Sequence, residues 1–264
     1  NEFETDQAIE AQLGVKISQL MQDFRQELLE KLVEPFQTKD QLIYTRVLIG
    51  TAFAEIIMTV LQNDYDLVIK AMRPSETLEE RFLGSTDLHL LRKCPCPVWI
   101  DRPGKTIPYR KILAAVDPMS DESAAIKIMQ LATSLANHES TKLEIVHAWH
   151  LPGESLLRNG RARLSSTEVD QIVSNQEKLQ KDKLNSLLGN FGLRTDDANV
   201  HLVRGFAAAR ILEFGKSADL IVMGTIGRVG IPGFIIGNTA EDVLQSSESS
   251  ILAVKPDGYV SPLA

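Results

Sequence analysis

Short apolar runs alternate with amphipathic stretches through the second half of the chain. The runs have the length of strands that are buried on both faces of a parallel sheet, and the stretches between them carry apolar residues at helical spacing. This alternation predicts a doubly wound α/β sheet with right-handed crossovers, for which we assume the strand order 3-2-1-4-5. The predicted strands cover residues 111–116, 143–148, 200–203, 220–223 and 251–254, and the predicted helices cover residues 122–136, 165–189, 207–214 and 238–245.

Polar residues mark the ends of several predicted elements. Ser165 and Glu168 have the spacing of a capping box and predict the start of the long helix. Ser120 or Asp121 can cap the first helix of this half. Residues 152–163, between the second strand and the long helix, are predicted to form a polar loop.

An internal repeat relates the two halves of the chain. Residues 66–69 (DLVI) align with residues 219–222 (DLIV), and at the same offset residues 84–86 (GST) align with residues 237–239 (GNT). A constant offset over this length indicates a duplicated structural unit.

The first half contains only part of this unit. A helix over residues 17–32 and a strand over residues 42–48 match the long helix and the third strand of the second half. Nothing matches the first strand, the first helix and the second strand, and their absence would leave an unpaired sheet edge. We therefore expect an incomplete, N-terminally truncated domain over residues 1–103, a linker with proline and glycine over residues 104–108, and a complete domain over residues 109–264.

Composition limits the class of protein. The 264 residues suffice for two domains, and 44% hydrophobic with 24% charged residues is typical of a globular protein. The net charge of −7 argues against nucleic acid or an anionic membrane as the main partner, and no apolar stretch approaches the roughly 20 residues of a membrane helix. Two cysteines, Cys94 and Cys96, are too few for a disulfide framework, so we expect a cytoplasmic protein.

Glycines follow the predicted fourth strand at a spacing suited to binding phosphate. Gly224 and Gly227 are followed after nine residues by Gly237, which precedes Asn238 and Thr239 at the expected helix start. Glycine lets backbone N–H groups approach an anion, and a helix N-terminus attracts negative charge. Either of the two polar residues can cap that helix.

A carboxylate is predicted to lie beside this glycine loop. Asp117 follows the first strand, and the first and fourth strands are neighbours in the assumed order. Ligands of open α/β sheets bind at the carboxyl ends of the strands, where the strand order reverses. The two signals together predict a site for a phosphate-containing ligand in the second half.

The pattern Gly224-x2-Gly227-x9-Gly237, with Asp117 after the first strand, resembles the ATP-binding motif of universal stress proteins. Residues 89–99 (HLLRKCPCPVW) and 237–241 (GNTAE) resemble tandem-domain members of that family, and the resemblance covers nearly the whole chain. It implies two tandem doubly wound, parallel, five-stranded α/β domains of the adenine nucleotide alpha hydrolase-like type. It also implies cytoplasmic, stress-linked regulation and association through the fifth strands.

The resemblance further implies roles for residues at matching positions. Asp117 matches the acid that contacts the adenosine part of the ligand, and Val116 and Ala148 match the lining of the adenine slot. Met223 and Gly224 match the strand end beneath the ribose and phosphates. The phosphate loop and the helix start are matched by Gly227, Gly237, Asn238 and Thr239. The implied ligand is ATP or another adenine nucleotide, with or without Mg²⁺.

Departures from the family pattern change what we expect of each half. Asn238 stands where ATP-binding members usually have Ser or Thr, and its amide cannot place a hydroxyl on a phosphate or a metal. In the first half, Ala71 and Pro74 replace the first two glycines, so we expect that half to be free of nucleotide. Arg228, next to Gly227, either pairs with a phosphate or is solvated.

Plainer interpretations stay open for several of these residues. Asp117 could be a loop acid that caps the following helix, and the glycine loop could be a turn without a ligand. Cys94 and Cys96 are expected to be structural thiols, because no nearby pattern completes a four-ligand zinc site. His147 and His150 are expected to be packed or solvated side chains.

No catalytic constellation is visible in the sequence, such as a nucleophile elbow, a P-loop lysine or paired metal carboxylates. We therefore expect a regulatory binding protein that is not an enzyme, in which nucleotide orders the loop over residues 225–236. The alternatives are a binder of a lipid or hydrophobic metabolite, a slow ATP hydrolase, and a scaffold with two relic sites. We expect the two halves to pair within the chain, and a homodimer is optional.

Overall fold

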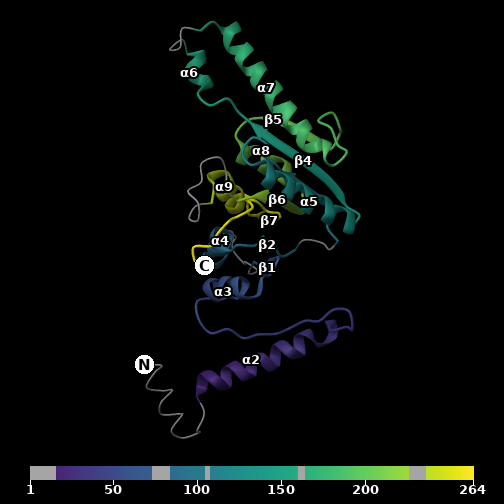
Figure 1. Cartoon of the computed structure of the whole chain (residues 1–264), viewed down its shortest axis with the longest axis vertical. Coiled ribbons are helices and arrows are strands. Elements are labelled where there is room, and N and C mark those ends of the chain that lie inside the picture. The colour runs from purple at the N-terminus through teal and green to yellow at the C-terminus, as the bar shows by residue number, and fades with distance from the viewer. Residues whose placement is uncertain (1–15, 73–83, 105–107, 160–163, 226–235) are drawn as a thin grey trace. The chain divides into compact units, whose positions relative to one another are not determined.

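The described strands join into one seven-stranded sheet (Figure 1). The computed structural model describes residues 16–72, 84–104, 108–159, 164–225 and 236–264. The strand order is β1-β2-β7-β6-β3-β4-β5, and all neighbouring strands are parallel except β2 and β7. The strands are β1 (Val68–Ala71), β2 (Val98–Asp101), β3 (Lys111–Ala115), β4 (Lys142–Trp149), β5 (Val200–Arg204), β6 (Leu220–Gly224) and β7 (Ser250–Val254).

The second half supplies five parallel strands, which confirms the predicted α/β architecture. In the chain order of that half, the strands lie as third, second, first, fourth and fifth. All residues of β7 and the first four of β6 are buried. A strand covered on both faces needs apolar residues at consecutive positions, so the apolar runs predict these strands to within one residue at each end.

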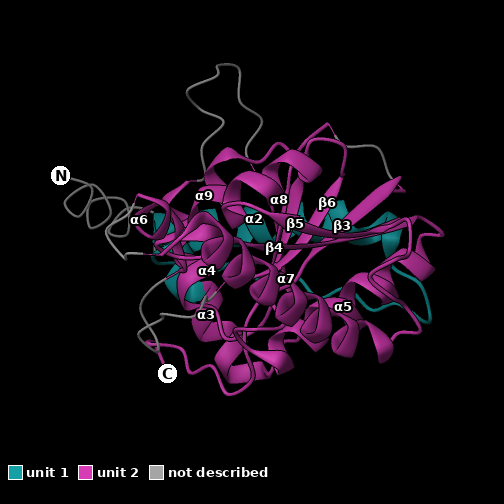
Figure 2. Ribbon diagram, turned by 90° about the horizontal axis from the view of Figure 1, so that it is seen from above, with its two compact units in different colours: residues 1–55 teal, residues 56–264 magenta. Residues whose placement is uncertain are grey.

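Helices cover both faces of this part of the sheet. The helices are α2 (Ile17–Val33), η1 (Glu34–Phe36), α3 (Ala52–Asn63), α4 (Ser85–Lys93), α5 (Glu122–His138), α6 (Glu154–Arg158), α7 (Ser166–Gly189), α8 (Ala207–Gly215) and α9 (Asn238–Ser246). Figure 2 shows α5 and α7 on one face and α8 and α9 on the other. The main core lies under α5 and α7, where Met129 and Leu187 pack with Ile112 and Leu220. The chain divides into compact units over Asn1–Glu55 and Ile56–Ala264.

Side-chain caps fix the starts of two of these helices as predicted. Asp121 Oδ1 accepts from the N–H of Ala124 at 3.1 Å and starts α5. At the start of α7, Ser165 Oγ accepts from the N–H of Glu168 at 3.3 Å, and Glu168 Oε2 accepts from the N–H of Ser165 at 2.8 Å. This reciprocal pair is the predicted capping box.

The predicted cap of α9 is wrong. Gly237 occupies the cap position with an extended backbone (φ −62°, ψ 144°), so Asn238 and Thr239 are the first two residues inside the helix. No side chain caps this helix start. A glycine is tolerated at the cap position. Because it has no side chain, it offers the first N–H groups of the helix no acceptor.

The prediction for the first half is correct for its helix and wrong for its third strand. The helix α2 confirms the expected helix over residues 17–32. Residues 42–48 form no strand. A strand needs a neighbour for its backbone hydrogen bonds, and the described part of this half has no counterpart of the second strand. Side chains of α2 hold this segment, because Gln26 Nε2 donates to Thr45 Oγ1 at 2.6 Å and Gln22 Nε2 donates to the Val47 carbonyl at 3.3 Å.

The predicted polar loop over residues 152–163 contains the short helix α6. Gly153 precedes it in the left-handed region (φ 74°, ψ 9°), a conformation that glycine adopts without steric cost. The helix has five residues, none of them buried, so it leaves no apolar periodicity in the sequence.

The fifth strands of the two repeats pair with each other inside the chain. The antiparallel ladder of β2 and β7 sets Val98 opposite Ala253 and Trp99 opposite Leu252. The first repeat thereby adds β1 and β2 to the sheet of the second, and the described strands of the two tandem α/β repeats share one sheet. Association through the fifth strands, which the resemblance implies, is an intramolecular contact here.

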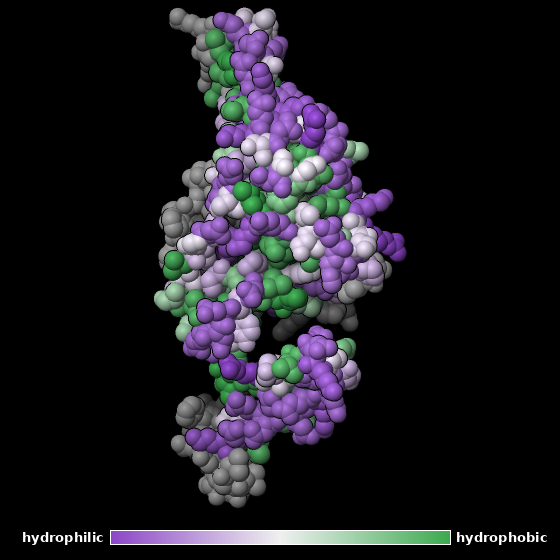
Figure 3. Space-filling view, turned by 45° about the vertical axis from the view of Figure 1, so that its right-hand side comes forward, coloured by the Kyte–Doolittle hydropathy of each residue, from purple (hydrophilic) through white to green (hydrophobic). Residues whose placement is uncertain are grey.

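Apolar side chains reach the surface in patches between hydrophilic ones on the face that Figure 3 shows. Ile69 on β1 is one of the large exposed apolar residues, with 63% of its surface accessible. None of the described helices combines the length and the apolar character that crossing a membrane requires.

Candidate functional site

A cavity of about 290 Å³ lies at the carboxyl ends of β3, β4 and β6. The ends of β3 and β6 lie side by side there, because these strands pair in parallel with Ala115 opposite Met223. The starts of α5 and α9 and part of α8 complete the walls. This is the place where the strand order of the second repeat reverses, and it is the usual ligand site of open α/β sheets.

The structure brings the described candidate residues together around this cavity. Eight of the ten line it, namely Val116, Asp117, Ala148, Met223, Gly224, Gly237, Asn238 and Thr239. The other two, Gly227 and Arg228, lie outside the described residues. Sequence reasoning missed further lining residues, among them Ser120, Asp121, Ala207 and Ile211. Small or apolar residues at helix starts carry no motif that could have indicated the last two.

Asp117 shapes the turn that leaves β3. Its Oδ1 accepts from the N–H of Met119 at 3.1 Å, and its carbonyl accepts from the N–H of Ser120 at 3.2 Å. The cap of the following helix is Asp121, so the interpretation of Asp117 as that cap is wrong. The turn holds the Asp117 carboxylate on the cavity wall.

The glycine loop is fastened at both of its described ends. Thr225 is 1% exposed, and its N–H donates to the Val254 carbonyl at 3.1 Å. The N–H of Gly237 donates to the Thr225 carbonyl at 2.9 Å. The loop therefore leaves and rejoins the fold at neighbouring points, and α9 starts where the loop ends. The N-terminus of this nine-residue helix is directed at the cavity through Gly237, Asn238 and Thr239.

A buried histidine supports the strand end that carries Val116 and Asp117. His147 on β4 is fully buried, as expected for a packed side chain. Its Nδ1 donates to the Val116 carbonyl at 2.9 Å, and its Nε2 is hydrogen-bonded to the Gln180 side chain at 2.8 Å. Both ring nitrogens are thereby engaged. His147 links α7 to the strand end beside Asp117 and has a structural role there.

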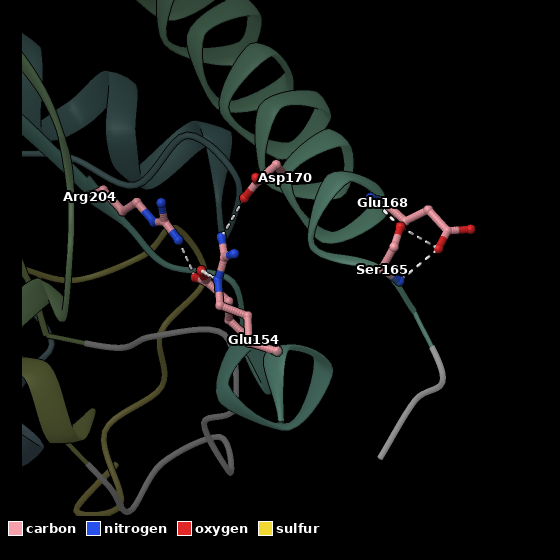
Figure 4. Close-up of polar contacts among 6 residues, drawn as sticks. Glu154, Ser165, Glu168, Asp170 and Arg204 are labelled. Carbon is pink, nitrogen blue, oxygen red and sulfur yellow. Dashed lines mark hydrogen bonds and ion pairs between the residues drawn. The ribbon is translucent and has the colours of Figure 1, made fainter. Parts of the chain in front are cut away.

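An ion cluster holds the chain segments that leave the same wall (Figure 4). Glu154 on α6 pairs with Arg204 at the end of β5 and accepts from Arg158 Nε at 2.7 Å, and Arg158 donates to Asp170 on α7 at 2.8 Å. The guanidinium of Arg204, followed by that of Arg158, holds the pKa of Glu154 below its ordinary value. Ala148 and Ala207 of the cavity wall lie a few residues from this cluster in the chain, and the cluster joins α6, α7 and the end of β5.

The charge of the cavity is negative. Asp117 and Asp121 line it, and no lysine or arginine does so within the described part of the chain. Among the described lining residues, the partners for an anionic group are therefore uncharged donors, namely the backbone N–H groups at the start of α9, the Asn238 amide and the hydroxyl groups of Ser120 and Thr239.

Comparison with protein-family models matches the Universal stress protein family twice, over residues 2–102 and 108–255. The chain belongs to the universal stress protein family. It is 30% identical over 222 residues to Universal stress protein E of Escherichia coli K12, an alignment that covers 80% of this chain and 67% of the relative. A homologue of Universal stress protein E in Haemophilus influenzae is 29% identical over 203 residues, which cover 75% of this chain and 64% of the relative.

Solved structures share the fold of this universal stress protein. A functionally unknown protein of Pseudomonas aeruginosa PAO1, PA1789, superposes with a TM-score of 0.68 at 26% identity, covering 92% of this chain and 79% of that one. A universal stress protein of Archaeoglobus fulgidus superposes with a TM-score of 0.60 at 20% identity, covering 90% of this chain and 80% of that one. The second likeness shows the fold alone.

The first repeat of this universal stress protein has different chemistry at the matching place. Lys70 aligns with Met223, and Asp87 aligns with Ala240. Lys70 and Asp87 form an ion pair with each other. Asp87 is 3% exposed and accepts from the N–H of Gly84 at 3.0 Å, which closes the N-terminus of α4. A carboxylate at this helix start repels a phosphate, which favours the expectation of a nucleotide-free first half. Pro74 lies outside the described residues.

Proposed function

We propose that the second repeat binds an adenine nucleotide in the cavity at the ends of β3, β4 and β6, as the regulatory ligand of a stress-response protein. The observation that carries the proposal is the convergence of eight predicted positions on one cavity, with Asp117 on one wall and the start of α9 on another. Val116, Ala148 and Ala207 supply an apolar wall on which a base can lie.

The proposed division of labour follows from the charges. The Asp117 carboxylate accepts from ribose hydroxyl groups, and the N–H groups at the start of α9 hold the phosphates. Asn238 adds an amide donor in place of the hydroxyl of other family members. The turn that fixes Asp117 and the hydrogen bonds of Thr225 position these groups before the ligand arrives.

A magnesium ion fits this donor set as a partner of the phosphates. The cavity offers the carboxylates of Asp117 and Asp121 and the hydroxyl of Ser120, and Mg²⁺ prefers oxygen ligands. Within the described residues, no group of three His, Cys, Asp or Glu side chains could hold a metal by itself. The ion would neutralise charge between the nucleotide and these carboxylates. We propose binding without turnover, in which the carboxylates of the described lining serve the ribose and the metal ion.

Calorimetric titration of ATP into wild-type and variant protein tests this proposal. Asp117→Asn keeps the oxygen that accepts from Met119, so the turn is retained while the charge is lost. We expect it to weaken ATP binding about tenfold, the effect of one hydrogen bond to a charged group. Asp257→Asn removes a charge of the same kind at an exposed position and should leave affinity unchanged. Equal affinity of wild type and Asp117→Asn, or no heat from ATP with either, would contradict the proposed site.

A further inference from the structure

A second cavity, of about 260 Å³, lies along the flank of α5 where the two repeats meet. Its apolar walls come from both repeats. Ile69 on β1 belongs to the first repeat. The second repeat supplies Ile112 on β3, Leu220 on β6 and Leu135 on α5. It is separate from the cavity at the strand ends, and the two share no lining residue.

The repeat explains why this space is open. Ile69 of the first repeat aligns with Val222 of the second. Val222 is 0% exposed and belongs to the core that α5 helps to form, whereas Ile69 is 63% exposed. The described part of the first repeat has no counterpart of α5. Among the described residues, no counterpart of α5 therefore covers the sheet face at Ile69, and the cavity forms beside it.

Two aromatic rings form one side of the cavity. The ring centroids of Trp99 on β2 and Tyr109 lie 5.9 Å apart at an interplanar angle of 39°. The indole N–H of Trp99 has no hydrogen-bond partner among the described residues. Aromatic faces carry partial negative charge and attract cations, most strongly in the case of Trp.

Two carboxylates lie beside the rings. Asp101 Oδ1 accepts from Tyr109 Oη and from Ser250 Oγ, both at 2.9 Å, while its Oδ2 accepts no hydrogen bond from the described part of the chain. Glu139, directly after α5, forms no ion pair with any described residue. No lysine or arginine lines this cavity in the described ranges. Within the described residues, the polar side of the cavity is therefore negative and has no cationic side chain.

We infer that this cavity binds an organic cation with a compact apolar body, such as a substituted ammonium compound. The Trp99 and Tyr109 rings and the carboxylates of Asp101 and Glu139 attract the cationic group, and the aliphatic walls cover its apolar part. An anionic amphiphile is disfavoured, because its head group would lie against two carboxylates without a cationic partner. The inference concerns a different cavity from the proposed nucleotide site and does not depend on it.

Calorimetry with three probes of one shape tests the predicted charge preference. Benzyltrimethylammonium carries the cation, neopentylbenzene is its neutral isostere, and phenylmethanesulfonate carries the opposite charge. We expect benzyltrimethylammonium to bind once per chain, to quench Trp99 fluorescence, and to bind at least about fivefold more tightly than either of the others. Equal binding of all three probes, or no binding of the cation, would overturn the inference.

Matched variants on α5 and its end locate the site. Glu139→Gln should weaken binding of the cation about three- to fivefold, the size of one cation–carboxylate contact near the surface. Glu122→Gln removes the same charge at the other end of α5 and should have no effect. Trp99→Leu should weaken binding of the cation more than Glu139→Gln does. A thermal melting curve of Trp99→Leu shows whether this variant folds. ATP binding should be unchanged in Glu139→Gln. Equal cation affinity in wild type, Glu139→Gln and Trp99→Leu would place the cation elsewhere and overturn the inference. The inference would also be overturned if the protein formed a dimer in solution that the cation did not dissociate, because a second copy of the chain would then cover the cavity.

Discussion

At the scale of single residues, Lys255 shows how a charge is buried where the two repeats join. It directly follows β7 and is 2% exposed. Its ammonium group donates to the carbonyls of Leu91 and Arg92 at the C-terminal end of α4 and lies 4.6 Å from the centroid of the Tyr259 ring. Burial lowers the pKa of Lys255 to about 8, opposed by the nearby Cys94 thiol. The helix end favours a cation, but the burial still costs free energy at neutral pH.

This burial predicts a pH-dependent contribution to stability. The unfolded lysine keeps its proton up to about pH 10.5, while the folded one loses it above about pH 8. Between these values the unfolded state binds more protons, so the contribution of Lys255 to the free energy of unfolding rises with pH, by up to about 3 kcal/mol. Urea unfolding of wild type and Lys255→Met at pH 7, 9 and 10.5 should show their difference changing in this direction. The exposed Lys216→Met should show no such trend, and a pH-independent difference for Lys255→Met would contradict the assignment.

At the scale of elements, the helix starts decide which side chains line the candidate site. Asp121 caps α5, so Asp117 is left to shape the cavity wall. Gly237 occupies the cap position of α9, so the first N–H groups of that helix remain available to a ligand. The capping box of α7 starts the helix that carries Gln180, the partner of the buried His147.

The capping box can be tested on its own helix. Ser165→Ala removes the side-chain acceptor for the N–H of Glu168 and should lower the free energy of unfolding by about 1 kcal/mol. Ser174→Ala makes the same change at an exposed position inside α7 and should be neutral or slightly stabilising, because alanine is the better helix former. Chemical unfolding measures both variants. Equal free energies of unfolding for wild type and Ser165→Ala would show that the capping box does not stabilise the fold.

At the scale of the whole molecule, the ladder between β2 and β7 makes one sheet out of two repeats. Arg92 of α4 also pairs with Glu241 of α9 at 2.9 Å, so the first repeat contacts the helix that starts at the candidate site. The two repeats have diverged at the matching helix starts, where Asp87 closes one and Gly237 leaves the other open. This asymmetry predicts a single nucleotide site per chain.

The sequence predicts the elements that are fixed by burial and misses those that are fixed by tertiary contacts. Consecutive apolar residues indicate β3 and β7 because nothing else suits a strand covered on both faces. Glu154 on α6 pairs with Arg158 one turn later in the same helix and with Arg204 at the end of β5, and only the first of these pairs is visible as a local pattern in the sequence. Residues 42–48 have the apolar character of a strand but pair with no strand in the described part of the chain, which no property of the segment itself reveals.

The sequence likewise indicates part of the candidate site. Glycines and Asp117 mark the strand ends in the sequence, and the fold brings them together because β3 and β6 are neighbours. The cavity beside Trp99 could not be predicted, because its walls combine side chains from β1, β2, β3, β6 and α5 whose proximity depends on how the repeats join.

The number of adenine nucleotides bound per chain distinguishes a single site in the second repeat from two sites or none. Freshly purified protein would be denatured and its released nucleotides quantified, and protein stripped of nucleotide would then be titrated with ATP. We expect one equivalent of nucleotide per chain, bound in the second repeat, and weaker binding in Asp117→Asn. Two equivalents per chain would contradict the closed first repeat, and no binding at all would contradict the proposed nucleotide site.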